Sequence, residues 1–439
     1  MKILKFGGTS VGRPDRMQQV AKIVTADSEA KIVVLSALSG TTNALETTGK
    51  LLFKGKQGEA KQVIDELHLH YQKFYKELLT QEATQEEANK YIDQVFRLIK
   101  SFFNVPFSDV ESKTILAQGE LLSTKLFHLH LKETSQASAL IPALEYMRLN
   151  ADDEPDLEFI SEKLSTLISA HSDNPIFITQ GYICLNADGK IDNLKRGGSD
   201  YTASLVGAGI RASLVQIWTD IDGMHNNDPR IVEKTIPIAE LSFNEASELA
   251  YFGAKILHPS SILPAKQFNI PVQLKNTMDP EAHGTLITAE EKTTHIKAVA
   301  AKDGITAIKI KSTRMLLAYG FLRRIFEVFE NYKIPIDMIT TSEVAVSLTI
   351  ENTDRLDEVV EDLNIFGEVM VDQNQSIVCI VGNQIAEQPG LVKKVFDALE
   401  NIPVRMISYG GSRYNISVLI ESSYKHQALT ALNHGLFNL

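Results

Sequence analysis

The sequence has only two cysteines, no long apolar run and no excess of positive charge. Cys184 and Cys379 lie far apart inside apolar stretches, which indicates reduced core thiols and excludes a disulfide scaffold or a cysteine metal cluster. No apolar run reaches the roughly 18 residues of a membrane span, and no leader pattern opens the chain, which favours the cytoplasm and no membrane partner. Acidic residues outnumber basic ones, 55 to 44, which argues against nucleic acid as a partner. An anionic substrate therefore requires a locally basic site.

The first 290 residues alternate short apolar runs with longer amphipathic segments. This alternation is typical of an α/β domain with a mostly parallel sheet and helices on both faces. A helical insert is predicted from about 44 to 135, because apolar residues follow helical spacing through 82–103. The clearest strands are 31–36, 175–179, 215–219 and 271–274.

The region from 291 to 439 follows a shorter cycle of strands and helices. We expect two α+β modules, about 305–373 and 374–439, as an internal duplication. The strand-like piece 296–300 could belong to the second module and so interleave the two. The predicted strands are 305–310, 336–341, 345–350, 368–372, 376–381, 405–409 and 415–420, and the predicted helices are 320–332, 355–363, 391–399 and 424–432.

The opening segment, MKILKFGGTSVG, has the order of a phosphate-binding turn. A buried strand leads to Lys5 and Phe6, and Gly7 and Gly8 then allow backbone N–H groups to approach an anion. The lysine precedes the glycines, which excludes the Walker A order. An ordinary strand-to-helix turn with an exposed lysine remains an equal alternative for this segment alone.

A second glycine turn, KRGGSDYTA at 195–203, precedes a helical pattern. Ser199 or Asp200 is the expected N-cap, and the free helix N–H groups together with Arg196 would bind an anion. The alternative is a capped glycine turn without function. Thr219 and Asp220 end a strand, where α/β sheets bind nucleotides, although a polar loop would have the same pattern.

Other motif matches are weaker. Residues 207–212 (GAGIRA) fit a dinucleotide pattern but follow a helix, which favours close helix packing. The pairs His68/His70 and His128/His130 are spaced by two on predicted helices and so point to different faces, which disfavours a metal site. The remaining lysines, arginines, glycine turns and carboxylates suit phosphoryl transfer, in which a carboxylate acceptor needs no general base.

Taken in order, seven blocks resemble aspartate kinase of the monofunctional, lysine-sensitive type with a C-terminal pair of ACT modules. They are KFGGTSVG at 5–12, SALSGTTN at 36–43, GELLST at 119–124, ITQGY at 178–182, RGGSDYTA at 196–203, WTDIDG with DPR at 218–230, and FGAKILHP at 252–259. The resemblance implies an amino-acid-kinase fold followed by two ferredoxin-like ACT modules. It also implies ATP- and Mg²⁺-dependent phosphorylation of the β-carboxylate of L-aspartate to 4-phospho-L-aspartate, the first step toward lysine, threonine and methionine. Another amino-acid kinase, or a silent amino-acid sensor, remains the alternative.

The resemblance also implies roles for individual residues of the catalytic part. Lys5 would contact the β- and γ-phosphates and Asp200 would orient it. The expected ATP contacts are Lys5, Phe6, Gly7, Gly8, Thr219, Asp220, His225, Arg230 and Lys255, and the expected aspartate contacts are Ser36, Thr42, Glu120, Arg196, Gly197 and Gly198. His225 stands where relatives commonly have tyrosine, and Lys195 stands where they have glycine.

In the C-terminal part, the resemblance implies an effector site for L-lysine and a homodimer formed through the ACT modules. Asp337 and Glu343 would hold the ammonium, and N–H groups near Gly320 would take the carboxylate. Ala318 stands where such enzymes often have serine. A purely structural dimerisation module is the alternative. The full expected set is Met315, Ala318, Gly320, Phe321, Leu322, Asp337, Thr341, Ser342 and Glu343.

Overall fold

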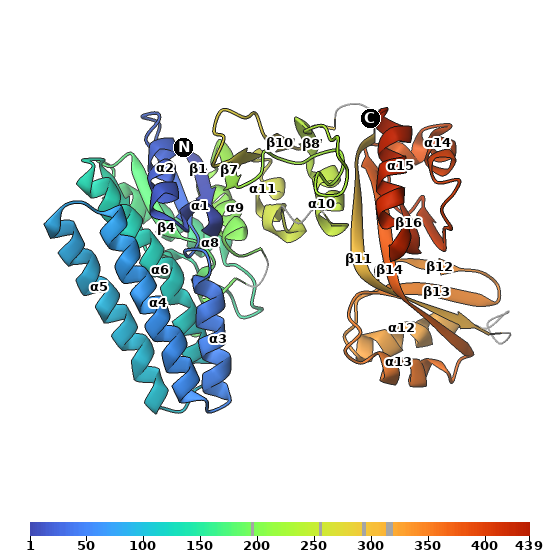
Figure 1. Cartoon of the computed structure of the whole chain (residues 1–439), viewed down its shortest axis with the longest axis horizontal. Coiled ribbons are helices and arrows are strands. Elements are labelled where there is room, and N and C mark those ends of the chain that lie inside the picture. The colour runs from blue at the N-terminus through green and yellow to red at the C-terminus, as the bar shows by residue number, and fades with distance from the viewer. Residues whose placement is uncertain (195–196, 254–256, 292–295, 313–318) are drawn as a thin grey trace. The chain divides into compact units, whose positions relative to one another are not determined.

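Two units make up the chain, which is drawn in Figure 1. The first comprises residues 1–224 and 257–289, and the second comprises residues 225–256 and 290–439. No helix among the described residues is both long and apolar enough to cross a membrane. The computed structural model describes residues 1–194, 197–253, 257–291, 296–312 and 319–439.

The segment 225–256 groups with the C-terminal unit, whereas the sequence predicts one domain over 1–290. Its polar side chains explain the difference. The Asn226 amide donates to the side-chain oxygen of Asn433 at 3.0 Å, and the Asn227 amide donates to the carbonyl of Leu429 at 3.0 Å. Both amides are buried and need such partners, so the segment follows the C-terminal helix rather than the first sheet.

A mostly parallel sheet forms the centre of the first unit, and the strands that this unit contributes follow the order β3-β4-β2-β1-β7-β9-β10. All neighbours are parallel except β9 and β10. β1 lies between β2 and β7, with Lys5 opposite Val34 and Ile217. The strands are β1 Lys2–Phe6, β2 Lys31–Leu35, β3 Ser138–Leu140, β4 Ile176–Gln180, β7 Leu214–Thr219, β9 Val272–Asn276 and β10 Thr285–Thr288, with a separate hairpin of β5 Ile183–Leu185 and β6 Ile191–Asn193.

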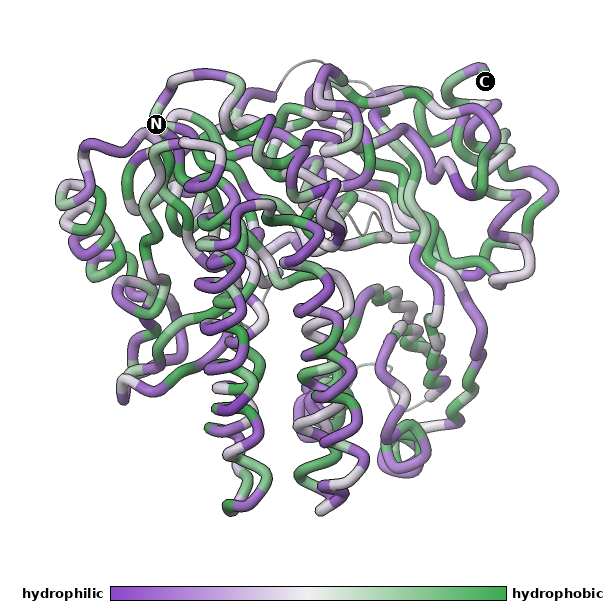
Figure 2. Tube along the Cα trace, turned by 60° about the vertical axis from the view of Figure 1, so that its left-hand side comes forward, coloured by the Kyte–Doolittle hydropathy of each residue, from purple (hydrophilic) through white to green (hydrophobic). Residues whose placement is uncertain are grey.

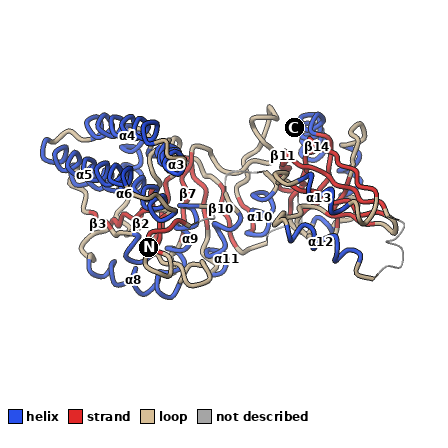
Figure 3. Tube along the Cα trace, turned by 90° about the horizontal axis from the view of Figure 1, so that it is seen from below, coloured by secondary structure: helices blue, strands red, loops and turns tan. Residues whose placement is uncertain are grey.

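Helices cover both faces of this sheet, as predicted (Figure 3). Leu4 and Phe6 join a core with the helices of one face, α2 to α6. Strand alternation turns Lys5 to the other face, where α9 lies. In α9 a Cβ on Gly207 would come within 2.7 Å of Val215, so this glycine serves close helix packing, as the sequence indicates. The helices are α1 Gly8–Val11, α2 Pro14–Val24, α3 Thr41–Phe53, α4 Gln57–Leu78, α5 Glu82–Ser101, α6 Asp109–Glu133, α7 Ala143–Tyr146, α8 Leu157–Ala170, α9 Gly198–Ile210 and α11 Leu263–Gln267.

The long helices α3 to α6 fill the stretch predicted as a helical insert. Hydrophilic and hydrophobic residues alternate along them in Figure 2, and the apolar stripe of α4 repeats at Ala60, Ile64, Leu67 and Tyr71. This spacing buries one side of each helix. His68, on α4, stacks on Phe96 and lies 3.0 Å from Asp93, so its partners are protein groups.

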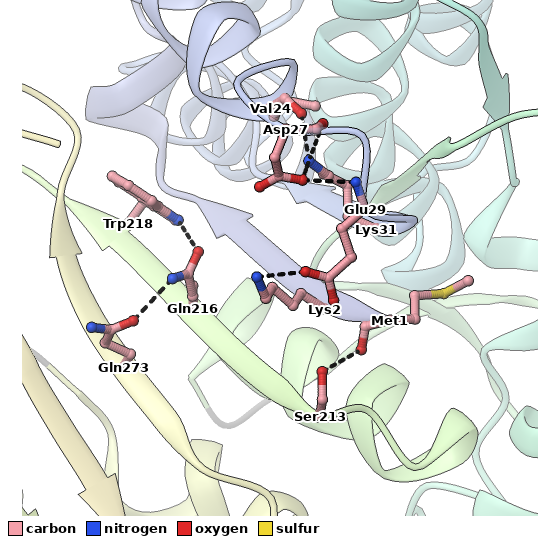
Figure 4. A network of polar contacts seen from close by, with 10 residues as sticks. All are labelled: Met1, Lys2, Val24, Asp27, Glu29, Lys31, Ser213, Gln216, Trp218 and Gln273. Carbon is pink, nitrogen blue, oxygen red and sulfur yellow. Dashed lines mark hydrogen bonds and ion pairs between the residues drawn. The ribbon is translucent and has the colours of Figure 1, made fainter.

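Polar contacts close the edge of the first sheet where its strands begin (Figure 4). Lys31 is buried at the start of β2, and its ammonium donates to the carbonyl of Val24 at 2.9 Å and to the Asp27 carboxylate at 2.7 Å. Lys2 pairs with Glu29 at 2.6 Å beside it. The Lys31 hydrogen bond holds the pKa of Asp27 below its usual value. We call this side, where the strands begin, the closed edge, and the opposite side, where the parallel strands end and α/β sheets bind ligands, the open edge.

The second unit contains an antiparallel sheet in the order β12-β13-β11-β14-β16-β15. One core lies under α12 and α13 and another lies under α14 and α15. The elements are β8 Glu240–Ser242, α10 Phe243–Tyr251, β11 Ile296–Lys311, α12 Phe321–Asn331, β12 Ile339–Thr341, β13 Ala345–Ile350, α13 Leu356–Leu363, β14 Glu368–Gly382, α14 Leu391–Ala398, β15 Met406–Tyr409, β16 Asn415–Glu421 and α15 Lys425–Phe437.

The two longest strands correct the sequence prediction. Segments 296–300 and 305–310 are expected to be separate strands, as are 368–372 and 376–381, but each pair forms one strand, β11 and β14. Gly304, with φ 76°, and Asn374, with φ 56°, lie at the joints, where the β11–β14 register shifts. The turn signals of the sequence therefore mark β-bulges. Ala298 and Ala300 pair with Val381 and Cys379. The piece 296–300 therefore lies next to segment 376–381, the predicted first strand of the second module.

Candidate active site

The site lies at the carboxyl ends of the parallel strands of the first unit, beside β1, β2 and β4. Backbone hydrogen bonds tie the first residue after a strand to the end of the neighbouring strand: Gly7 N–H donates to the Trp218 carbonyl at 3.4 Å, and Gly181 N–H donates to the Leu35 carbonyl at 2.9 Å. A cavity of about 400 Å³ opens beside these strand ends. Its volume falls in the range of small-molecule sites.

Lys5 and Asp200 form an ion pair at this edge, with 2.6 Å between Nζ and Oδ1. Only 11% and 16% of the two side chains are exposed. β1 directs Lys5 toward α9, and Asp200 lies in the first turn of that helix, where the helix dipole favours a carboxylate. A Cβ on Gly7 would lie 3.5 Å from the lysine Nζ, so the glycine backbone and the ammonium face one space.

The start of α9 differs from the sequence prediction. Neither Ser199 nor Asp200 is the N-cap; the helix begins at Gly198 and its N-cap is Gly197, with φ 70°. A Cβ on Gly197 would overlap the hydroxyl of Ser261, so only glycine fits. The shift leaves the Ser199 hydroxyl to accept a hydrogen bond from the Ser36 hydroxyl at 2.8 Å.

The cavity brings together several residues that the sequence predicts for substrate. Ser36, Thr42, Glu120 and Gly198 all line it, and so does Gly8, which the sequence predicts as an ATP contact. Asn43, Tyr182 and Ser199 line it too, and the site prediction omits them. All three fall inside the motif blocks SALSGTTN, ITQGY and RGGSDYTA, so the signal for them is present in the sequence.

Glu120 is the most perturbed group of the cavity. Its Oε1 accepts a hydrogen bond from the Ala37 N–H at 3.2 Å, and Oε2 is buried with no hydrogen-bond partner among the described residues. Burial raises the pKa of Glu120 to about 8. A buried carboxyl group in this state favours a cationic ligand, which would restore its charge.

The residues expected at ATP fall into three places. Thr219 ends β7 at the open edge and Asp220 follows it, and the Thr219 hydroxyl donates to Asp220 at 3.2 Å. His225 and Arg230 belong to the second unit, where Arg230 forms a bidentate pair with Asp228 at 2.9 and 2.7 Å. Phe6 turns away and stacks on Trp218, with 5.7 Å between ring centroids, so it can offer a ligand only its backbone. Lys195, Arg196 and Lys255 lie outside the described residues.

The residues expected at the effector site lie in the second unit. Gly320, with φ 77°, is the N-cap of α12, and Phe321 and Leu322 begin the helix. Thr341, Ser342 and Glu343 follow at the exposed end of β12. Met315 and Ala318 lie outside the described residues.

Asp337 is buried and already has two partners. Its Oδ1 accepts hydrogen bonds from the Lys302 ammonium at 3.1 Å and from the Tyr251 hydroxyl at 2.9 Å. Oδ2 is buried without a hydrogen-bond partner in the described part of the chain. Lys302 and Tyr251 are 35 and 86 residues away in sequence, so no local pattern could have revealed them.

Comparison with known proteins agrees with this arrangement. The profile of the amino acid kinase family matches residues 1–276, and an ACT domain profile matches residues 378–436. The parallel sheet, the lysine-carboxylate pair at its open edge and the antiparallel C-terminal sheet therefore define an amino acid kinase with an ACT region.

The relatives narrow this class. Lysine-sensitive aspartokinase 3 of Escherichia coli is 34% identical over 99% of both chains. The crystal structure of E. coli aspartokinase III with aspartate and ADP superposes with a TM-score of 0.84 at 33% identity, covering all of both chains. Its complex with lysine and aspartate gives 0.83 at 34% identity, over 100% of this chain and 99% of that one. The chain belongs to the aspartokinase family, whose members are aspartate kinases.

Proposed function

We propose that this aspartate kinase transfers the γ-phosphoryl group of ATP to the β-carboxylate of L-aspartate. The product is 4-phospho-L-aspartate, the first intermediate toward lysine, threonine and methionine. One observation carries the proposal: the Lys5–Asp200 pair lies beside a cavity in which Glu120 keeps a buried, unpartnered oxygen. The E. coli relative whose structure contains aspartate and ADP supports it.

The substrate amino group is the natural partner of Glu120. Its ammonium supplies the charge and the donor that Oε2 lacks. Ser36 and Thr42 offer hydroxyl groups in the same cavity. Arg196, at the start of the block RGGSDYTA, is the proposed partner of a substrate carboxylate. The acceptor carboxylate is already ionised at neutral pH, so the reaction needs no general base.

Lys5 would act on the phosphoryl group in transit. Charge develops on the equatorial oxygens during transfer, and a fixed ammonium stabilises it without reorganisation. Asp200 holds that ammonium at 2.6 Å, so the cation is in position before the nucleotide binds. Gly7 and Gly8 would bind phosphate oxygens through backbone N–H groups.

Mg²⁺ is expected with the nucleotide. The described residues contain no group of three or more His, Cys, Asp or Glu side chains that would hold a metal alone. A cation held mainly by phosphates requires only one or two carboxylates, and Asp220 at the end of β7 fits this need. When bound, Mg²⁺ neutralises phosphate charge. Thr219, His225, Arg230 and Lys255 complete the proposed nucleotide contacts.

L-lysine is the proposed effector, and the ACT modules are the proposed homodimer contact. The E. coli relative is named lysine-sensitive, and one of its structures contains lysine. In this chain, Asp337 Oδ2 is buried and unpartnered among the described residues, which suits an ammonium group. Gly320 is the N-cap of α12, and the free N–H groups of this helix start would bind the effector carboxylate.

ATP turnover by the purified protein tests both parts. Aspartate, glutamate, acetylglutamate and carbamate are compared as acceptors, and turnover with aspartate is then titrated with lysine, threonine and methionine. We expect turnover that depends on aspartate and falls with lysine. Equal ATP consumption with and without aspartate contradicts the proposed reaction, whereas inhibition by threonine or methionine alone contradicts only the effector.

A further inference from the structure

The last residue of α10, Tyr251, lies beside the Asp337 carboxylate. The two residues after it, Phe252 and Gly253, run against β11, because Gly253 has φ 123° and a Cβ there would overlap the Ala301 carbonyl. The next residue of β11 is Lys302. The end of α10 is therefore pressed onto the strand that supplies one partner of Asp337.

Tyr251, Lys302 and Asp337 contact one another in all three pairs. Both the hydroxyl and the ammonium donate to Asp337 Oδ1, at 2.9 and 3.1 Å, and the ammonium also lies 4.7 Å from the centre of the Tyr251 ring. Burial first, and then the Asp337 charge, raise the pKa of Tyr251 to about 12. The hydroxyl thus remains a donor at all physiological pH values.

The charges of this cluster do not cancel. Lys302 is shared between Asp337 and Glu351, at 3.1 and 3.0 Å. Burial lowers the pKa of Lys302, but Glu351 and Asp337 outweigh this effect and raise it, so the ammonium stays charged. One cation faces two carboxylates, and Asp337 Oδ2 is the buried oxygen left over. A second cation at Oδ2 competes for the negative charge that Tyr251 and Lys302 now share.

We infer that Tyr251 is a positioning residue that transmits occupancy of Asp337 by an ammonium-bearing effector to the end of α10. The inference rests on the proposed effector function. The hydroxyl links Asp337 directly to the last residue of α10, and in the sequence Lys255, an expected ATP contact, comes two residues after Gly253. A weaker Tyr251–Asp337 hydrogen bond frees the end of α10 and changes nucleotide binding. Effector and nucleotide are thereby coupled without sharing a site.

Tyr251→Phe tests this coupling, because it keeps the ring over which Lys302 lies and removes only the hydroxyl. The readout is the ratio of the KM for ATP with saturating L-lysine to that without it, with kcat measured alongside. We expect this ratio to fall at least about fivefold toward one, the lower end of typical allosteric couplings, while calorimetry still detects lysine binding. Tyr332→Phe is the matched control, since it removes a 2.9 Å hydrogen bond to Asp362 within the same unit. It should leave the ratio unchanged.

Each other outcome counts against the inference. If L-lysine inhibits Tyr251→Phe as strongly as it inhibits the wild type, Tyr251 has no coupling role. If the variant no longer binds lysine, Tyr251 is a binding residue instead. Amide hydrogen exchange in α10 gives a second measurement, independent of turnover and of any variant. Wild-type exchange there should change when lysine is added. No change overturns the inference, whereas loss of aspartate-dependent turnover alone contradicts the proposed reaction.

Discussion

Glu120 shows at the residue scale how burial and function are linked. A carboxyl group with a pKa near 8 holds its proton at pH 7, yet the proposed ligand is an ammonium that requires the charged form. Binding of L-aspartate should therefore release close to one proton per site at pH 7. Calorimetric titration in buffers of different ionisation enthalpy measures this number directly.

Glu120→Gln should abolish the proton release and raise the KM for aspartate by one to two orders of magnitude, as expected when a charge-assisted hydrogen bond is lost.

The same variant tests how the free energy of unfolding depends on pH. A folded pKa raised from 4.5 to about 8 contributes stability at low pH that is lost as pH rises through 8. Relative to wild type without substrate, Glu120→Gln should gain on the order of 4 kcal/mol in free energy of unfolding between pH 5 and pH 9. A constant difference across that range would show that Glu120 is ionised in the free protein.

Lys5→Met tests the proposed catalytic cation. Removing one fixed charge that stabilises the transition state should lower kcat by about 10²- to 10³-fold, while the KM for aspartate changes little. Lys2→Met is the control, because Lys2 lies on the same strand at the closed edge and its pair with Glu29 is partly exposed. The control should keep kcat within about twofold and lose at most roughly 1 kcal/mol of stability. A matching loss of kcat in both variants would mean that β1 as a whole has been disturbed.

At the scale of elements, the turn before α9 depends on space as well as on conformation. Gly197 and Gly55 both have φ 70°, but a Cβ on Gly55 meets nothing within 4 Å, whereas one on Gly197 would overlap Ser261. Gly55→Ala should cost about 1 kcal/mol of stability and leave activity intact. Gly197→Ala should cost more and also lower kcat/KM at least tenfold, because it moves the turn that carries Asp200. Urea unfolding and turnover measurements compare the two variants. Equal losses of stability and of kcat/KM in both would show that the backbone conformation alone matters.

The elements that the sequence predicts well are those with strong local patterns. Strand 345–350 is predicted at its observed bounds, and the helices of the insert follow from their apolar spacing. The errors arise where tertiary structure overrides a local signal. Gly304 and Asn374 have turn chemistry, yet neighbouring strand pairing continues past them as bulges. Likewise the hydroxyl and carboxylate after Gly197 suggest an N-cap, but close packing against Ser261 fixes the helix start at the glycines.

For the whole molecule, the sequence motifs indicate which residues of the first unit lie near one another, but no motif indicates the contacts of Asp337 in the second unit. Lys5, Glu120 and Asp200 each lie in a motif block, and the parallel strands bring the loops of these blocks, such as those after β1 and β2, to one side of the sheet. Tyr251 and Lys302 have no motif, because their roles depend on the packing of α10 on β11. The grouping of segment 225–256 with the C-terminal unit was not predictable for the same reason. Its buried asparagines form hydrogen bonds to residues about 200 positions away, and these contacts exist only in the folded chain.

The proposed homodimer makes a prediction about the assembled protein. β12 is an edge strand of the second sheet; Ile339 on it is 39% exposed, and Val344 at its turn is 43% exposed. Exposed apolar groups at a sheet edge are typical of an interface. Ile339→Lys with Val344→Lys should reduce the mass measured by light scattering from that of a dimer to that of a monomer. Ile365→Lys, at a side chain 70% exposed just beyond α13, should leave the dimer intact. A dimer that survives the double substitution would assign the contact to another surface of the chain.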